Sequence, residues 1–289
     1  MAKKTKVGII GCGNMGSAIA KGISSKYQLF IFDKDTSKTK NIVKVKVAKS
    51  IFDLVNNVDV VLLAVKPQDF EAVLNEIKED VNKKLIISIA AGTETKYIER
   101  AFGKVRVIRV MPNLLIRIGK GITALCKGKF ATSKDLNFVR EIFNQLGATL
   151  VLEEKMMDAD TGFLGSGPGF HYKLLESIDR NEWLNFTKNN FIPIMAASGE
   201  ASGFSRKRSQ VLAKLMAQGD LLLLEKTKES PGDLCIRVTS KGGTTEAGLK
   251  ELKGNVRFLP KAVKAAIKRA KELSNEAATF QAKRRRKVA

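Results

Sequence analysis

Three glycines near the start of the chain constrain its fold more than any other feature. Gly11, Gly13 and Gly16 follow a short apolar run, residues 7–10, in the spacing G-x-G-x-x-G, and Asn14 begins a predicted helix. In a strand–turn–helix unit the first glycine permits the tight turn, the second lets the backbone approach a pyrophosphate, and the third lets the helix pack on the strand. The helix N-terminus offers free N–H groups to the phosphates. The pattern therefore predicts a dinucleotide site, and the alternative is a glycine-rich turn without a ligand.

The chain is strongly basic and long enough for one large domain or two ordinary ones. It has 289 residues, of which 44% are hydrophobic, so a sizeable core is expected. Its 51 basic and 29 acidic side chains give a formal net charge of +22, which favours anionic partners such as NADP, a carboxylate substrate or nucleic acid. The dense basic run at residues 283–287 is expected to be a disordered tail, with a nucleic-acid contact as the alternative.

Cysteine and histidine are scarce. Cys12, Cys126 and Cys235 lie far apart in the sequence, and His171 is the single histidine, so neither a disulfide framework nor a metal site is expected. The basic start of the chain precedes an apolar run that glycine soon interrupts, and no apolar run approaches 18 residues. We therefore expect no signal peptide and no membrane span, and a cytoplasmic location.

Hydrophobic periodicity divides the chain into two parts. Apolar or alternating runs predict strands over residues 7–10, 29–32, 45–47, 59–65, 85–90, 105–110, 121–126 and 149–152. Helical segments separate most of these runs, which is typical of a doubly wound Rossmann-type α/β sheet. After residue 153 helical periodicity takes over, with helices predicted over residues 157–165, 170–178, 191–201, 206–226 and 259–278. We therefore predict an α/β domain over residues 1–153, a helical domain over 154–278, and a tail over 279–289.

Two residues at the end of the second predicted strand bear on the choice of cofactor. In dinucleotide-binding folds this position meets the adenosine ribose. Asp33 would accept a hydrogen bond from a 2′-hydroxyl and favours NAD, whereas Lys34 would pair with a 2′-phosphate and favours NADP. The high positive charge of the chain favours NADP. The alternative is that Asp33 and Lys34 are ordinary turn residues with no role in cofactor binding.

Other strand ends and one loop carry further candidate residues. Lys66 stands at the carboxyl end of a central strand, where ligands bind in open α/β sheets, and Pro67 suits the first turn of the next helix. Ala91 and the following glycine would let a flat ring lie close to the backbone. Residues 239–245, rich in glycine and hydroxyls, precede a helix expected at Glu246 and are typical of a nest of N–H donors for an anion such as a carboxylate. The alternative is a capped helix start without a ligand.

One apolar run in the helical part has two interpretations. Residues 221–224 are leucines, so the helix is apolar all round at this point. A core position explains this composition, and a subunit interface explains it as well. We favour the interface.

Six short segments, taken in order, resemble the pyrroline-5-carboxylate reductase family. They are GCGNMG at 11–16, AVKPQ at 64–68, SIAAG at 88–92, RVMPN at 109–113, GSGPGF at 165–170 and SKGGTTEAGL at 240–249. The resemblance implies a Rossmann domain followed by a helical dimerisation domain, a homodimer or higher homo-oligomer, and NADPH or NADH as cofactor. It also implies hydride transfer to the C=N carbon of 1-pyrroline-5-carboxylate, which gives L-proline.

The resemblance also implies which residues form the site. Cofactor contacts are implied for Gly11, Cys12, Gly13, Asn14, Met15, Gly16, Ala64, Val65, Lys66, Pro67, Met111, Pro112 and Asn113, and the strand ends add Asp33, Lys34 and Ala91. Substrate contacts are implied for Ser240, Gly242, Gly243, Thr244 and Glu176. Thr245 is the candidate catalytic residue, with its hydroxyl near the ring nitrogen. A protonated imine is already electrophilic, so positioning against C4 of the nicotinamide would supply much of the rate.

The chain departs from this family in two places. Lys241 stands where the family usually has proline, and the stretch between Glu176 and Gly203 is longer than usual. His171 is expected to be a packing residue of the helical domain.

Two alternatives remain. A β-hydroxyacid dehydrogenase needs a lysine shortly after a glycine cluster, but Pro168 lies between that cluster and Lys173, and the spacing is wrong. A non-catalytic, cofactor-sensing or nucleic-acid-associated protein on the same fold would account for the basic charge.

Overall fold

The computed structural model describes the backbone of residues 4–288 and their side chains except at residues 67–68 and from 277 onward. Within this part the chain forms two compact units. The first contains the residues up to Pro112, Thr123–Glu154 and the end of the chain from Ala277. The second contains Asn113–Ile122 and Lys155–Glu276.

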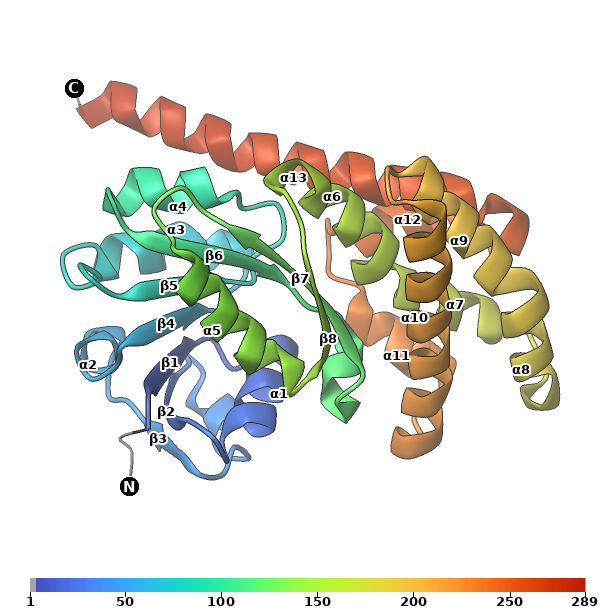
Figure 1. The fold of residues 1–289 in the computed structure, drawn as a ribbon, viewed down its shortest axis with the longest axis horizontal. Helices are drawn as coiled ribbons and strands as arrows, with labels where there is room; N and C mark the ends of the chain where they lie inside the picture. Colours follow the sequence, from blue (N-terminus) through green and yellow to red (C-terminus); the bar gives the residue numbers. More distant parts are fainter. Residues whose placement is uncertain (1–3, 289) are drawn as a thin grey trace. The chain divides into compact units, whose positions relative to one another are not determined.

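An eight-stranded sheet, counted over the described residues, is the centre of the first unit (Figure 1). Its order is β3-β2-β1-β4-β5-β6-β7-β8. The strands are β1 Lys6–Ile10, β2 Gln28–Phe32, β3 Val45–Val47, β4 Val60–Leu63, β5 Leu85–Ser88, β6 Arg106–Met111, β7 Gly121–Lys127 and β8 Gly147–Val151. Strands β1 to β6 pair in parallel, and β7 pairs antiparallel with β6. The sequence predicted each strand to within two residues at either end.

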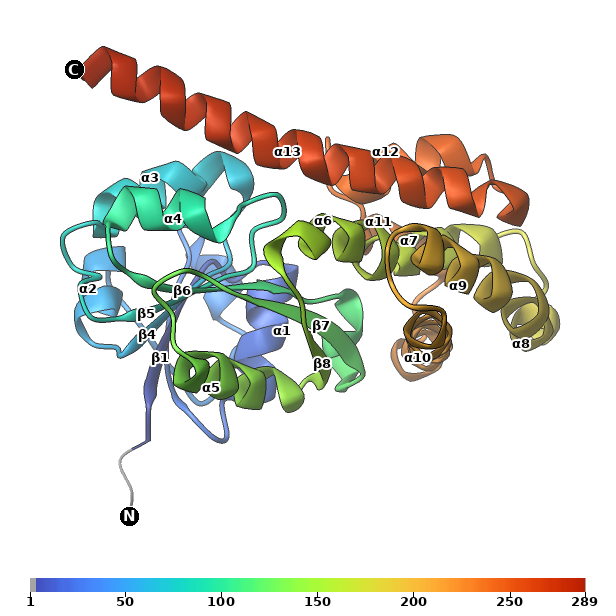
Figure 2. The same ribbon diagram turned by 45° about the horizontal axis from the view of Figure 1, so that its top comes forward.

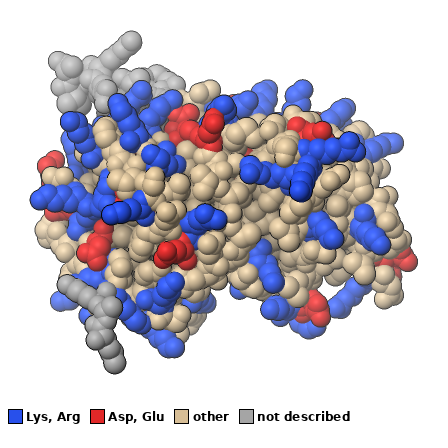
Figure 3. All heavy atoms as spheres, in the orientation of Figure 1, with Lys and Arg blue, Asp and Glu red and all other residues tan. Residues whose placement is uncertain are grey.

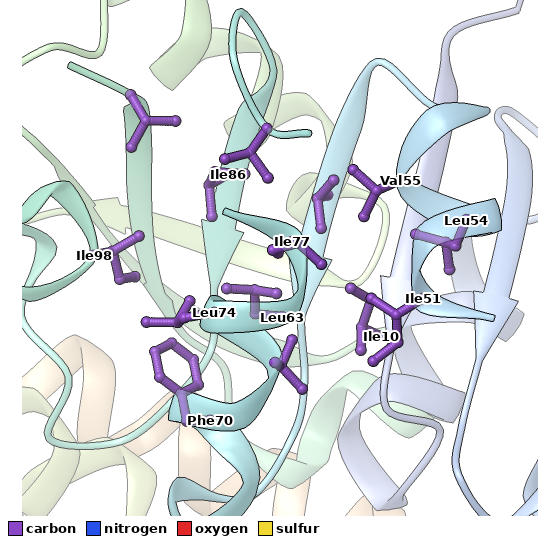
Figure 4. Packing of buried hydrophobic residues seen from close by; sticks show 14 of the residues in the cluster. Ile10, Ile51, Leu54, Val55, Leu63, Phe70, Leu74, Ile77, Ile86 and Ile98 are labelled. Carbon is purple, nitrogen blue, oxygen red and sulfur yellow. The ribbon is translucent and has the colours of Figure 1, made fainter. Parts of the chain in front are cut away.

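Helices cover both faces of the sheet, so the predicted doubly wound α/β fold is confirmed (Figure 2). They are α1 Asn14–Ile23, α2 Ile51–Asn56, α3 Pro67–Ile77, α4 Thr95–Phe102 and α5 Ser133–Asn144. Apolar side chains of α2, α3 and α4 pack on β1, β4 and β5, among them Leu54, Leu74 and Ile98, which are at most 2% exposed (Figure 4). On the other face Tyr27, just after α1, packs edge-on against Phe138 of α5, with 5.9 Å between ring centroids.

An ion pair between a buried arginine and a half-buried glutamate holds the segment that follows β8. Arg109 in β6 is 2% exposed and donates from Nη1 to Oε1 of Glu154 at 2.7 Å. Oε2 of Glu154 accepts both the backbone N–H and the hydroxyl of Thr95, at 3.2 and 2.6 Å. Because Thr95 begins α4, the carboxylate also satisfies a free N–H at that helix start. Glu154, three residues beyond the end of β8, thus ties this segment to β6 and to α4.

The second unit is helical, as the sequence predicted. Its helices are α6 Met157–Asp160, α7 Gly167–Leu175, α8 Trp183–Phe186, α9 Ile192–Ala201, α10 Arg206–Thr227, α11 Pro231–Val238 and α12 Thr244–Leu252, with π-helical turns at Thr161–Gly165 and Thr187–Phe191. Helix α13, Leu259–Val288, belongs to the second unit up to Glu276 and to the first unit from Ala277. Short 3₁₀ turns lie at Thr36–Thr39, Leu114–Ile118, Glu154–Met156, Arg180–Glu182 and Val256–Phe258. The long stretch after Glu176 therefore forms α8, the second π-helical turn and α9.

Three local features differ from the sequence analysis. Helix α11 was not predicted, although Ser230 and Asp233 form a capping box around its first turn, with Pro231 as first helical residue. Helix α12 begins at Thr244, two residues before the expected start. Helix α13 continues to Val288, where a disordered tail was expected, because alanine, lysine, arginine and glutamine are good helix formers. The side chains of the basic run 283–287 lie outside the described residues.

Two of the four leucines at residues 221–224 belong to the core of the second unit. Leu223 and Leu224 are 0% and 4% exposed within the single chain, whereas the other two are half-buried. The core interpretation therefore holds for Leu223 and Leu224.

His171 is a packing residue, as predicted. It is fully buried, with Nδ1 3.0 Å from Oδ2 of Asp220 and Nε2 2.9 Å from Oγ1 of Thr187. The ring of Phe191 stacks on the imidazole at 4.1 Å between centroids. Burial raises the pKa of Asp220, and the hydrogen bond from His171 opposes that shift. Thr187 and Phe191 belong to the longer stretch, which therefore completes the core around the histidine.

Candidate functional site

Most of the predicted cofactor residues meet at one edge of the sheet. Gly11 follows β1, Asp33 follows β2 and Ala64 follows β4, while Ala91 lies three residues beyond β5 and Met111 ends β6. Because these five strands are parallel, their carboxyl ends lie at the same edge. This is where open α/β sheets bind their ligands.

Two of the three glycines are required by the backbone itself. Gly11 has φ of +99°, and a Cβ built there would lie 2.6 Å from the carbonyl oxygen of Ala64. A Cβ at Gly16 would lie 2.0 Å from the carbonyl oxygen of Gly11. Larger residues at either position would push the turn away from β4 or lift α1 from the turn.

Gly13 differs, because the folded chain itself does not require a glycine there. Its φ is −68°, which any residue adopts, and no described atom lies within 4 Å of a Cβ built at this position. Gly13 is exposed at the N-cap of α1, whose first N–H groups no side chain caps. A helix N-terminus of this kind attracts an anion, and the space that a Cβ would fill suits a phosphate. The geometry thus fits a dinucleotide pyrophosphate.

The end of β2 contains charges that largely pair with one another. Oδ2 of Asp33 accepts the N–H of Cys12 at 2.7 Å, and Oδ1 accepts the N–H of Asp35 at 2.9 Å. Lys38 Nζ lies 3.7 Å from the same Oδ1. Lys34 donates to Asp69 at 2.7 Å, and this hydrogen bond raises the pKa of the exposed lysine. Asp33 therefore joins the glycine turn to the loop after β2, and Lys34 presents its charge at the surface.

The remaining cofactor candidates lie in the glycine turn, in the first turn of α1, after β4 and at the start of α3. Burial, with the nearby Asp33 carboxylate, raises the pKa of Cys12 to about 12, so its thiol is neutral and unreactive at pH 7. Asn14 and Met15 form the first turn of α1 and are at least partly exposed. Ala64 and Val65 are half-buried, Lys66 is exposed at the N-cap of α3, and Pro67 is the first residue of that helix.

In the second unit, residues 240–243 form a tight turn before α12. The carbonyl oxygen of Ser240 accepts the N–H of Gly243 at 2.9 Å, and Gly242 has φ of +70°. Thr244 and Thr245 then form the first turn of α12, with Gly243 at its N-cap. This end of the helix presents N–H groups that lack intrahelical partners and can hold a carboxylate.

Helix α7 packs against the same helix start. Ser166 Oγ donates to Thr244 Oγ1 at 3.0 Å, and both residues are buried. A Cβ at Gly169 would lie 2.5 Å from Cγ2 of Thr245, so glycine is needed for this close approach. Thr245 is 5% exposed. No role was predicted for Ser166, which belongs to the GSGPGF segment. It contacts Thr244, which is 78 residues away in the sequence.

Two predicted residues lie apart from these groups. Glu176 caps the far end of α7, seven residues or about 10 Å along the helix from Gly169. There it pairs with Lys173 at 2.5 Å, so the lysine of the dehydrogenase alternative is also tied to a carboxylate. Asn113 belongs to the second unit, where its amide donates to the carbonyl of Leu164 at 3.4 Å and accepts the N–H of Ile122 at 3.1 Å. Pro112, beside it, is buried in the first unit.

On the face shown in Figure 3, lysines and arginines are spread over the surface, with acidic and neutral residues between them. Among the described residues, no helix combines the length and the apolarity that a bilayer-spanning segment needs.

Known proteins match both parts of the chain. Residues 6–92 match the family model described as NADP oxidoreductase, coenzyme F420-dependent, and residues 189–273 match that described as pyrroline-5-carboxylate reductase dimerisation. The pyrroline-5-carboxylate reductase of Arabidopsis thaliana is 34% identical over 94% of this chain and 97% of its own length. That of Aquifex aeolicus is 33% identical over 86% of this chain and 88% of its own. The chain belongs to the pyrroline-5-carboxylate reductase family.

Solved structures of this family have the same fold. Plasmodium falciparum pyrroline carboxylate reductase with NADP bound is 28% identical, with a TM-score of 0.61 over 93% of this chain and 98% of that one. The Coxiella burnetii pyrroline-5-carboxylate reductase is 27% identical, with a TM-score of 0.62 over 94% and 99%. The similarity thus extends across both units.

The contrast between Gly13 and Gly16 gives a direct test of the dinucleotide site. We expect Gly13→Ala to change the free energy of unfolding by less than about 0.5 kcal/mol but to weaken NADPH binding at least tenfold, since its methyl group meets only the ligand. Gly16→Ala is expected to destabilise the fold by about 1–3 kcal/mol, because its methyl group meets the Gly11 carbonyl. Urea unfolding and fluorescence titration measure the two effects. Unchanged NADPH affinity in Gly13→Ala would remove Gly13 from the site.

Proposed function

We propose that this protein reduces 1-pyrroline-5-carboxylate to L-proline, with NADPH as the hydride donor. The observation that carries the proposal is the relation to pyrroline-5-carboxylate reductases over nearly the whole chain. The geometry of each unit supports it separately. The first unit offers a helix start and glycine turn that suit a dinucleotide, and the second offers a helix start that suits a carboxylate.

The first unit would hold the cofactor. Gly13 and the first turn of α1 would bind the pyrophosphate through backbone N–H groups, and Gly11 would shape the turn that places them. Ala64, Val65, Lys66 and Met111 would line the nicotinamide half. NADPH, when bound, supplies the hydride that reduces the imine carbon. The NADP bound to the Plasmodium relative and the exposed Lys34 favour NADPH over NADH.

The second unit would bind the substrate. The first N–H groups of α12, at Thr244 and Thr245, would hold the carboxylate, and the turn at residues 240–243 would set their direction. The Thr245 hydroxyl would hold the ring nitrogen as its positive charge disappears during hydride addition. Glu176, at the far end of α7, would affect substrate binding only indirectly, through the position of that helix.

The Thr245 hydroxyl is tested with two near-isosteric variants. The native enzyme should oxidise NADPH when 1-pyrroline-5-carboxylate is added. Thr245→Val keeps the shape but removes the hydroxyl, and we expect kcat to fall about 10- to 100-fold, as for loss of one hydrogen bond to a charged group. Thr245→Ser should retain most of the activity, because it keeps the hydroxyl. Steady-state kinetics at fixed NADPH measure both, and equal kcat for valine and native threonine would exclude this role.

Cofactor preference is tested at Lys34. We expect the native enzyme to have a lower KM for NADPH than for NADH. Lys34→Ala should raise the KM for NADPH about fivefold, the effect of one exposed charge pair, and leave the KM for NADH unchanged. Lys40→Ala, an exposed lysine of the same loop, is the matched control. Equal effects of Lys34→Ala on both cofactors would show that this lysine does not contact the 2′-phosphate.

We also propose that the protein is a homodimer or a higher homo-oligomer paired through the second unit. Residues 189–273 match a dimerisation family model, and this range includes the whole of α10. Val211 and Leu215, one helical turn apart on α10, are 51% and 44% exposed in the single chain. Exposed apolar side chains in a row on a helix are typical of a subunit interface.

A charge at this row should separate the subunits. We expect Leu215→Glu to lower the mass measured by sedimentation equilibrium towards that of the 31.7 kDa chain, because it would bury an unpaired carboxylate. Phe52→Glu, at an exposed apolar position of α2 in the first unit and outside the dimerisation match, is the control and should leave the mass unchanged. An unaltered mass in Leu215→Glu would place the interface elsewhere.

A further inference from the structure

The turn at residues 240–243 has a geometry that its own sequence supports only in part. Its hydrogen bond from Gly243 N–H to Ser240 C=O and the positive φ of Gly242 are those of a type II β-turn. Glycine at the third position favours this turn, and proline at the second would fix φ in advance. Here the second residue is Lys241, which leaves the unbound chain free to adopt other conformations. Contacts from other elements therefore have to hold the backbone of residues 240–243 in this conformation.

The side chain of Arg269, on α13, contacts the turn directly. Its Nε donates to the carbonyl oxygen of Gly242 at 2.9 Å. Its Nη1 donates to Glu276 at 2.7 Å and to Glu272 at 3.3 Å, both on the same helix. The guanidinium is planar, so the bonds from Nη1 to the two carboxylates orient the group and direct Nε at the turn. The hydrogen bond to Glu276 also raises the pKa of Arg269, which stays charged.

The helix that carries Arg269 is firmly placed against α12. A Cβ built at Gly248 of α12 would lie 2.8 Å from the carbonyl oxygen of Ala262 on α13 and 2.3 Å from the Phe170 ring. Such a close backbone approach allows little movement between the two helices. Arg269 therefore reaches the turn from a fixed point.

The peptide between Gly242 and Gly243 is held at both ends. Arg269 holds its carbonyl oxygen, and the Ser240 carbonyl accepts its N–H. The N–H of Gly242 in turn donates to the carboxylate of Glu246 in the first turn of α12. Fixing this peptide plane fixes the direction in which Gly243, the N-cap, leads into the N–H groups of Thr244 and Thr245.

We propose that Arg269 is a positioning residue for the substrate-binding turn: by holding the Gly242 carbonyl, it orders the N-terminal end of α12 for the substrate carboxylate. The inference rests on the proposed function, because it names what orders the same site. Arg269 acts through the turn and touches neither substrate nor cofactor. Its loss should therefore weaken binding of the carboxylate rather than hydride transfer.

The first experiment compares kinetics of the intact enzyme. Arg269→Ala should raise the KM for 1-pyrroline-5-carboxylate about tenfold, the effect of one charge-assisted hydrogen bond, with little change in kcat or in the KM for NADPH. Arg269→Lys keeps the charge and should raise it less. Lys268→Ala is the matched control, because it removes a neighbouring cation of α13 that is 81% exposed. An unchanged substrate KM in Arg269→Ala, or an equal rise in Lys268→Ala, would overturn the proposal.

A second variant separates turn ordering from general packing. Lys241→Pro fixes φ at the second turn position, so in the Arg269→Ala background it should restore most of the lost substrate affinity. Hydrogen exchange of the segment 240–246 should be faster in Arg269→Ala and slower again in the double variant. If proline restores neither, Arg269 acts only in packing, and the proposal fails. These exchange rates are readable even in an inactive enzyme, whereas a folded native protein that does not reduce pyrroline-5-carboxylate would contradict the proposed function alone.

Discussion

The first unit depends on the close approach of the turn after β1 to the residue after β4. Gly11 donates its N–H to the Phe32 carbonyl at 2.8 Å, and the Ala64 N–H donates to the Ile10 carbonyl at 2.8 Å. These bonds extend the strand ladder beyond β1 and leave no room for a side chain at Gly11. The first turn of α1 is consequently placed over the carboxyl edge of the sheet, which is the condition for a phosphate to meet its N–H groups.

The central strands were readable in the sequence because they are buried on both faces, whereas the edge strands β3 and β8 are partly exposed. Val60–Leu63 and Leu85–Ser88, for example, are fully buried, and such strands appear in the sequence as continuous apolar runs. The glycine turn was readable for a different reason, since at Gly11 and Gly16 the backbone geometry leaves no room for a side chain. Helix α11 was not predicted, although the capping box formed by Ser230 and Asp233 is a local signal for its first turn.

The second half of the candidate site was only partly readable. Its turn and the threonines after it lie together in the sequence, and the resemblance pointed to them. Ser166 and Arg269 do not, because their contacts with residues 242–244 span 78 and 27 positions, and no local pattern encodes such a distance. The same limit applies to Asp33, because the hydrogen bonds that its carboxylate accepts from Cys12 and Asp35 were not indicated by its position at the strand end.

The core around His171 has a consequence for the longer stretch between Glu176 and Gly203. Thr187 and Phe191 cover the imidazole, and Asp220 completes its hydrogen bonding from α10. Deleting this stretch would expose the buried polar groups around His171 to water and remove the contacts of the imidazole with Thr187 and Phe191. This stretch is thus part of the hydrophobic core of the second unit, and a shortened protein would need compensating substitutions around His171.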